Sequence, residues 1–85
     1  MIHIDRIIRS IPAWLMETYL QEVGGEKGED GRISGPGWSA HVEQIEDFKI
    51  YALSIGQIRL QIDVEDDIWP DLSNRIETKL LRGGG

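Results

Sequence analysis

The stretch Ile58-Arg59-Leu60-Gln61-Ile62-Asp63-Val64-Glu65 alternates strictly between apolar and polar residues. Because neighbouring side chains of a β-strand point to opposite faces, this alternation places four apolar side chains on one face and leaves the other face in water. Strands of this kind are typical of antiparallel sheets, which pack one face on a core and solvate the other. The stretch therefore predicts an antiparallel sheet with a single apolar face.

Two further strands are predicted directly upstream of this stretch. The first alternates apolar and polar residues over positions 38–43, and the second is an apolar run over positions 48–55 that ends at Gly56. The acidic pair Glu46-Asp47 lies between them and predicts a turn, because aspartate favours turn conformations.

A glycine-rich segment precedes these strands. Residues 24–37 hold six of the ten glycines of the chain, which predicts a loop with one short strand at residues 32–34. A phosphate-binding loop would connect a strand to a helix N-terminus and would carry a Lys-Ser or Lys-Thr pair. This segment instead follows a predicted helix and carries Glu26, Glu29 and Asp30, so phosphate binding is disfavoured.

That helix is predicted to follow a first strand at residues 2–9, where isoleucines alternate with polar residues. Ser10 is the expected N-terminal cap and Pro12 the expected first-turn residue, and Gly24-Gly25 is expected to end the helix. The apolar stripe of the helix recurs at helical spacing, through Trp14, Leu15, Tyr19, Leu20 and Val23.

A second helix is predicted after the acidic segment 65–67, whose carboxylates favour the positive N-terminal end of a helix. Pro70 suits its first turn, and its apolar stripe consists of Ile68, Trp69, Leu72, Ile76 and Leu80. The predicted order is strand, helix, three or four antiparallel strands, helix. This order is typical of an α+β fold with both helices on one face of the sheet. We expect residues 1–85 to form a single domain with a short glycine tail at residues 83–85.

Charge and composition exclude several classes of function. The net charge is −6, and the nine Lys and Arg residues are scattered among 15 acids, whereas nucleic-acid binding requires a basic stripe. No apolar stretch approaches the length of a membrane span, and the first six residues carry charges where a signal peptide has an apolar run. The chain has no cysteine, which excludes disulfides and thiolate metal sites. We therefore expect a cytoplasmic protein that binds neither nucleic acid nor membranes.

The remaining polar residues form no recognisable catalytic motif. His41 and Glu43 have the spacing of a metal pair on one strand face, but a cross-strand contact explains them more simply. Residues 65–67 lack the alternating ligands and central glycine of a calcium loop, and no serine lies in a Gly-x-Ser-x-Gly motif. We expect no catalytic residue, metal or cofactor, hence a protein that is not an enzyme. Three tryptophans are expected to pack in the core or to anchor an interface: Trp14, Trp38 and Trp69.

The sequence ends in Arg82-Gly83-Gly84-Gly85, and this tail has two interpretations. A glycine just past a helix is the commonest C-terminal cap. A Gly-Gly end, however, also enters narrow adenylating sites, because it has no side chains to obstruct its carboxylate. If the second helix runs to Leu81, four residues extend past it and span about 14 Å. On the second interpretation Gly84 and Gly85 form a reactive end, and Arg82 and Gly83 form its flexible neck.

Two longer stretches carry a family resemblance: residues 12–25, which begin Pro12-Ala13-Trp14-Leu15, and residues 53–60, which begin Leu53-Ser54-Ile55. They resemble the C-terminal accessory domain of proteins related to the molybdopterin-synthase small subunit, a family of ubiquitin-like sulfur carriers. The resemblance covers nearly the whole chain, but residues 1–85 contain no counterpart of the ubiquitin-like part of those proteins. It implies a fold similar to the TATA-binding-protein-like class, with the order strand, helix, four strands, helix. The domain that it resembles is a domain of unknown function.

The resemblance also implies a role for the tail. It suggests a small accessory protein linked to sulfur transfer or molybdopterin synthesis, in which Gly85 carries an acyl-adenylate or a thiocarboxylate. The implied partners are an adenylating enzyme, which binds the ATP, and a sulfur acceptor.

Two other functions stay open on the residues alone. The outer sheet face with Arg59, Gln61 and Asp63, or an exposed tryptophan, is suited to bind a protein partner or a second copy of the chain. The protein would then be a non-catalytic interaction or oligomerisation module with an inert tail. The third option is a small apolar ligand, held on the concave sheet beneath the glycine-rich loop.

Overall fold

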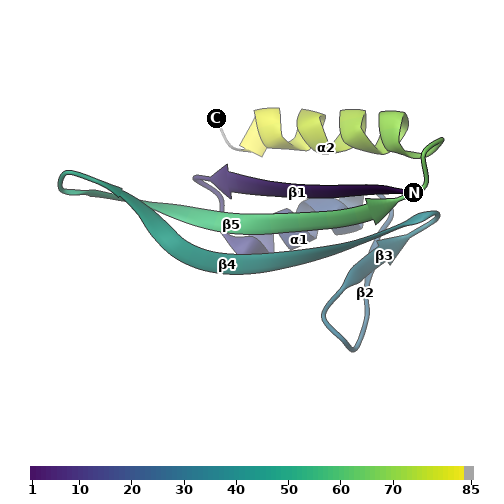
Figure 1. The fold of residues 1–85 in the computed structure, drawn as a ribbon, viewed down its shortest axis with the longest axis horizontal. Helices are drawn as coiled ribbons and strands as arrows, with labels where there is room; N and C mark the ends of the chain where they lie inside the picture. The colour runs from purple at the N-terminus through teal and green to yellow at the C-terminus, as the bar shows by residue number, and fades with distance from the viewer. Residues whose placement is uncertain (84–85) are drawn as a thin grey trace.

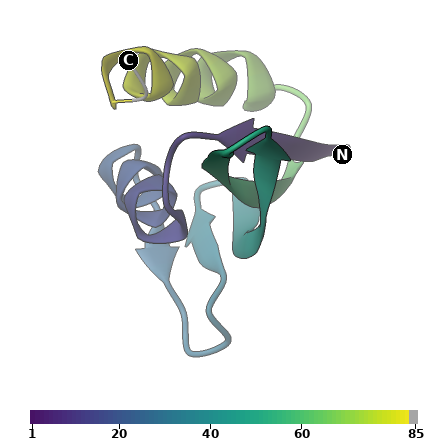
Figure 2. The same ribbon diagram turned by 90° about the vertical axis from the view of Figure 1, so that its left-hand side faces the viewer.

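The structure, a computed structural model, describes residues 1–83. Within these residues the chain forms, in order, β1 (Ile2–Arg9), α1 (Ala13–Glu22), β2 (Glu26–Lys27), β3 (Ile33–Gly35), β4 (Trp38–Ile50), β5 (Leu53–Val64) and α2 (Trp69–Gly83). The strands form one antiparallel sheet in the order β1-β5-β4-β3-β2, and both helices pack against one face of it (Figures 1 and 2). The predicted α+β fold is confirmed. Neither of these helices has the length and apolar character needed to cross a membrane.

The alternation of β5 organises the core. Ile58, Leu60, Ile62 and Val64 are at most 2 % exposed, whereas Arg59 is exposed on the opposite face, which we call the outer face. Each fully buried side chain of this size contributes about 1.5–3 kcal/mol. The helices, the neighbouring strands and the segments that flank α1 complete the core with Ile11, Met16, Leu20, Val23, Ile33, Trp38, Ala40, Leu72 and Ile76.

The N-terminus of α1 differs from the prediction. Ser10 is not its cap: this residue has a φ of 75°, and the helix begins at Ala13 with Pro12 in the N-cap position. Because Pro12 has no side-chain acceptor, the cap comes from elsewhere in the chain. The Gln44 side chain on β4 accepts a hydrogen bond from the Ala13 backbone N–H at 3.0 Å. A distant residue thus satisfies a group that the sequence assigned to a local serine.

The predicted end of α1 is confirmed. Gly24 has a φ of 107°, and the N–H of Gly25 donates to the carbonyl of Leu20 at 3.0 Å. Gly25 also lies where no side chain fits, since a Cβ atom there would be 2.5 Å from Ile33 Cγ2 and 2.7 Å from Trp38 Cη2. This glycine therefore permits the close packing of the helix end on β3 and β4.

The glycine-rich segment contains one strand more than predicted. The short strand expected at residues 32–34 is found as β3, and the additional strand β2 pairs with it in antiparallel register. A strand of two residues is too short to show a period in the sequence. Along the chain, four strands of the five-stranded sheet, β2 to β5, lie between α1 and α2. This is the upper of the two expected numbers, although the four are not the same segments as those predicted.

The predicted turn at Glu46-Asp47 is wrong. β4 continues through these two residues, and the register with β5 shifts there: Ile45 pairs with Gln57, but Phe48 pairs with Ile55. One extra residue on β4 therefore forms a β-bulge. Both a bulge and a turn interrupt the alternation of apolar and polar residues. The sequence pattern at Glu46-Asp47 therefore could not distinguish the two.

The predicted strand at residues 48–55 is also wrong, because the chain reverses within it. The turn lies at Tyr51 and Ala52, where Tyr51 has a φ of 54°, and Gly56 lies inside β5. β4 and β5 are therefore the two arms of one hairpin. Its far end projects beyond β1 and both helices (Figure 1).

The close packing of Gly25 generates a first prediction. Gly25→Ala should lower the free energy of unfolding by about 1–3 kcal/mol, because the new methyl group overlaps Ile33, Trp38 and the Leu20 carbonyl. Urea denaturation followed by tryptophan fluorescence measures this change. Gly56→Ala is the matched control, since a Cβ there meets no atom within 4 Å; it should be neutral or stabilise by about 0.4–1 kcal/mol. Equal stability of the two variants would contradict this account.

Candidate functional site at the end of the second helix

The predicted neck of the tail lies within the last turn of α2. This helix runs to Gly83, so Arg82 and Gly83 have helical backbone. The predicted reactive residues, Gly84 and Gly85, lie outside the described residues. Glycine in a helix is about 1 kcal/mol less favourable than alanine. The helix therefore ends on a residue that stabilises it only weakly, since proline alone is a poorer helix former than glycine.

Packing determines where α2 ends. Leu72 and Ile76 are buried against the sheet, and Glu77 forms an ion pair with Arg6 in the middle of β1. Beyond Glu77 the helix continues in the same direction as β1, toward Arg9. Its last turn therefore lies at the end of the molecule from which the β4–β5 hairpin projects (Figure 1).

The polar half of the outer face is a network of ion pairs. Arg59 donates two hydrogen bonds to the carboxylate of Asp5, at 3.0 and 2.6 Å. Asp63 accepts a hydrogen bond from Arg32 at 3.3 Å and also contacts the ring of His3. The two charged residues proposed from the sequence for partner binding, Arg59 and Asp63, are thus already paired within the chain. A partner would have to compete with these contacts.

The Asp5–Arg59 contact shifts both titrations. The hydrogen bond from Arg59 holds the pKa of Asp5 below its ordinary value of 3.8, and the guanidinium charge adds to this effect. The hydrogen bond to Asp5 in turn raises the pKa of Arg59. Both groups are exposed, so solvent screens the interaction and its contribution to stability is small.

The histidines are not gathered into a metal centre. His3 contacts Asp63, whereas His41 pairs in register with Gln61 and lies two residues from Glu43 on β4. Within the part of the chain that the structure describes, no group of three His, Cys, Asp or Glu side chains is placed to hold a metal ion.

The three tryptophans have different environments. Trp38 is only 6 % exposed and belongs to the core, and Trp69 is partly buried against it. Trp14 is 67 % exposed on α1. Core packing is therefore confirmed for Trp38, and Trp14 is the tryptophan that is accessible to a partner.

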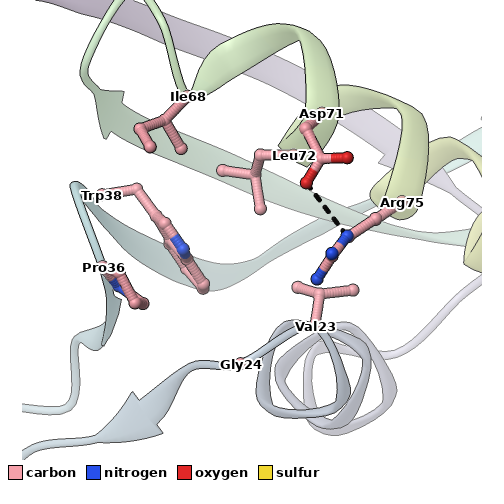
Figure 3. Close-up of a pocket in the computed structure, with 8 residues that line it drawn as sticks. All are labelled: Val23, Gly24, Pro36, Trp38, Ile68, Asp71, Leu72 and Arg75. Atoms are coloured by element: carbon pink, nitrogen blue, oxygen red, sulfur yellow. Dashed lines mark ion pairs between the residues drawn. The ribbon is translucent and has the colours of Figure 1, made fainter.

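A pocket of about 290 Å³ lies beside the N-terminal half of α2. Apolar side chains from the C-cap of α1, from β4 and from the start of α2 form its walls, and the ion pair between Asp71 and Arg75, 3.1 Å long, lies beside them (Figure 3). The glycine-rich segment contributes to the lining, which comprises Val23, Gly24, Pro36, Trp38, Ile68, Asp71, Leu72 and Arg75. The volume is at the lower limit of small-molecule sites, about 300–1,000 Å³. Ligand binding beneath the loop stays a prediction.

The sequence analysis missed an exposed apolar surface on the projecting hairpin. We call it the hairpin patch and define it as the outer-face residues of the hairpin arms: Ile45, Phe48, Ile50, Leu53 and Ile55. Leu53 is 66 % exposed and Ile50 is 43 % exposed. The apolar run at residues 48–55 was the available signal, but it predicts a single strand and not a hairpin end.

Comparison with known proteins gives one family. The family described as archaeal MoaD-like protein matches residues 4–85, nearly the whole chain and including the glycine tail. No curated protein matches the sequence significantly. The expected relation to the molybdopterin-synthase small subunit is thereby confirmed at the level of the family.

The Asp5–Arg59 pair generates a prediction about acid. Because the folded-state pKa of Asp5 is below its unfolded value, the pair stabilises the fold above that value and stops doing so as the pH falls through the folded-state pKa. Asp5→Asn should therefore be less stable than the wild type at neutral pH, and the difference should shrink and vanish as the pH falls below 3.8 and through the folded-state pKa of Asp5. Urea denaturation of both proteins across this range measures it. In the Arg59→Gln background Asp5→Asn should have no such pH-dependent effect. If the stability difference between Asp5→Asn and the wild type did not change with pH, the pairing of Asp5 with Arg59 would not be its cause.

Proposed function

The chain belongs to the archaeal MoaD-like protein family, and from this premise we propose that it is an accessory protein of sulfur transfer or molybdopterin synthesis. In this proposal it is a carrier and not an enzyme, and its glycine tail bears the transferred group. The observation that carries the proposal is the extent of the family match, which includes Gly83, Gly84 and Gly85 together with the domain. A single glycine suffices for a helix cap, so three in succession favour a tail that must extend.

The proposed chemistry takes place on the carboxylate of Gly85. One carboxylate oxygen attacks the α-phosphorus of ATP on a partner enzyme, which forms an acyl-adenylate and releases pyrophosphate. A sulfide donor then attacks the acyl carbon and displaces AMP, which leaves a thiocarboxylate. The sulfur acceptor is the second partner, and ATP is bound by the adenylating enzyme. The requirement for ATP is consistent with a cytoplasmic location.

The geometry of α2 supports a tail of this kind. Two residues beyond Gly83 reach only about 7 Å when extended. Unwinding of the last turn through Arg82 doubles this reach to about 14 Å. Because Gly83 is a poor helix former, the unwinding costs little, and Arg82 and Gly83 would serve as the neck.

The element order supports the accessory domain as the part of the family to which this chain corresponds. Strand, helix, four strands and helix is the order that the resemblance implied, and the structure has it in the sheet order β1-β5-β4-β3-β2. The proposed TATA-binding-protein-like class rests on this agreement.

Intact-mass measurement tests the function. The untagged chain ending at Gly85 is incubated with ATP, a sulfide donor and the purified adenylating enzyme of the same organism. The expected result is replacement of one oxygen by sulfur. Deletion of Gly84 and Gly85 should abolish this change without altering the circular dichroism spectrum, because the core of the described residues is formed between Ile11 and Ile76.

A chain extended by one alanine after Gly85 is the matched control, since it keeps all three glycines but moves the carboxylate. It should also stay unmodified. Modification of the deleted or extended chain would disprove the role of Gly85, and an unmodified intact chain would disprove carrier function with this enzyme.

A further inference from the structure

The bulge in β4 determines which way the apolar residues of the hairpin face. Side chains alternate regularly along β5, so Leu53 and Ile55 lie on the same outer face as Arg59. Their partners across the hairpin are Ile50 and Phe48. With regular alternation from Ile45, Phe48 and Ile50 would face the opposite side. The bulge places two residues of β4 opposite one residue of β5, and the side chains after it therefore face the outer side again.

Part of the hairpin patch is open to solvent. Both helices lie on the opposite face of the sheet, and β1 ends at Arg9, whose pairing with Gln57 leaves residues 53–56 of β5 beyond its reach. The Arg9 guanidinium lies 3.9 Å from the centre of the Phe48 ring, at the border between the patch and the ion pairs. An exposed apolar cluster bordered by polar groups is characteristic of a surface that binds another protein.

The short reach of the tail limits where an enzyme that takes it can bind. The last described residue is Gly83, and two residues after it reach about 7 Å. An enzyme that draws the carboxylate into a buried site must therefore contact the body of the protein around the end of α2. The hairpin patch lies toward the same end of the molecule (Figure 1), on the face of the sheet opposite the helices, and Leu81, which is 80 % exposed, lies in the last turns of α2. An enzyme that contacts both must therefore extend past the edge strand β1, from the outer face to the end of α2.

We propose that the hairpin patch, together with Leu81, is the docking surface for the adenylating enzyme that takes the glycine tail. This inference rests on the proposed function and names its partner surface: an apolar patch on the enzyme, beside the entrance to its adenylating site. A second copy of the chain is a poorer occupant. Stable interfaces use about 20–30 residues on each side, whereas the patch has five. A dimer formed through the patch alone would therefore be weak, and an enzyme that also binds the glycine tail gains additional contacts.

Steady-state kinetics of ATP–pyrophosphate exchange tests the proposal, with the purified adenylating enzyme and increasing concentrations of the chain. Leu53→Asp should raise the KM for the chain about tenfold or more and leave kcat nearly unchanged, because it weakens docking but not the chemistry. Ser34→Asp is the matched control: it places the same charge on an exposed outer-face position of β3, at the far end of the sheet. Its KM should equal that of the wild type.

A competition experiment separates docking from tail chemistry. The chain without Gly84 and Gly85 should inhibit charging of the intact chain, and the same truncated chain with Leu53→Asp should not. Leu53→Ser serves where the aspartate variant is unfolded by circular dichroism.

The outcomes are distinct. Charging with an unchanged KM for the Leu53 variants would overturn the docking surface and leave the proposed function intact. No exchange with the intact chain would overturn both. A patch-dependent dimer, seen by sedimentation velocity and lost in Leu53→Asp while KM is unchanged, would assign the patch to a second copy.

Discussion

Burial of one face of β5 is the constraint on which the rest of this fold depends. Ile58, Leu60, Ile62 and Val64 are the centre of the core, and every other element is placed by contact with them or with their neighbours. β1 and β4 pair on either side, and the two helices close the same face. Because these four side chains all point to one face, none of the side chains between them on the opposite face is needed for the core. The outer face can therefore vary in character without loss of the core.

The parts of the fold that follow from local pattern were predicted correctly, and the parts that depend on distant contacts were not. The alternation of β5 and the stripe of α2 are properties of short stretches, so the sequence alone indicates them. The bulge at Glu46-Asp47 cannot be read this way, since only the pairing with β5 distinguishes it from a turn. The same holds for the cap of α1, which Gln44 supplies from another strand.

The candidate site divides along the same line. The glycine tail is visible in the sequence because it is contiguous, and the family match includes it. The hairpin patch is assembled from two strands whose register the sequence does not specify, and the pocket beside Arg75 is assembled from the segment after α1, from β4 and from α2. That the hairpin and the last turn of α2 lie toward the same end of the molecule depends in addition on the direction of α2, which its contact with Arg6 on β1 helps to fix.

The bulge in β4 separates the length of the hairpin from the character of its surface. Removal of one residue between Ile45 and Phe48 would restore regular pairing and leave Phe48 opposite Ile55, because Phe48 would then lie two positions after Ile45 on the same face. If β4 instead kept its length and lost the bulge, Phe48 and Ile50 would turn to the helix side and Lys49 would take their place. The composition of the hairpin would be the same, yet its exposed surface would change from apolar to charged. The backbone conformation at Glu46-Asp47 therefore acts as a parity switch for the surface that follows it.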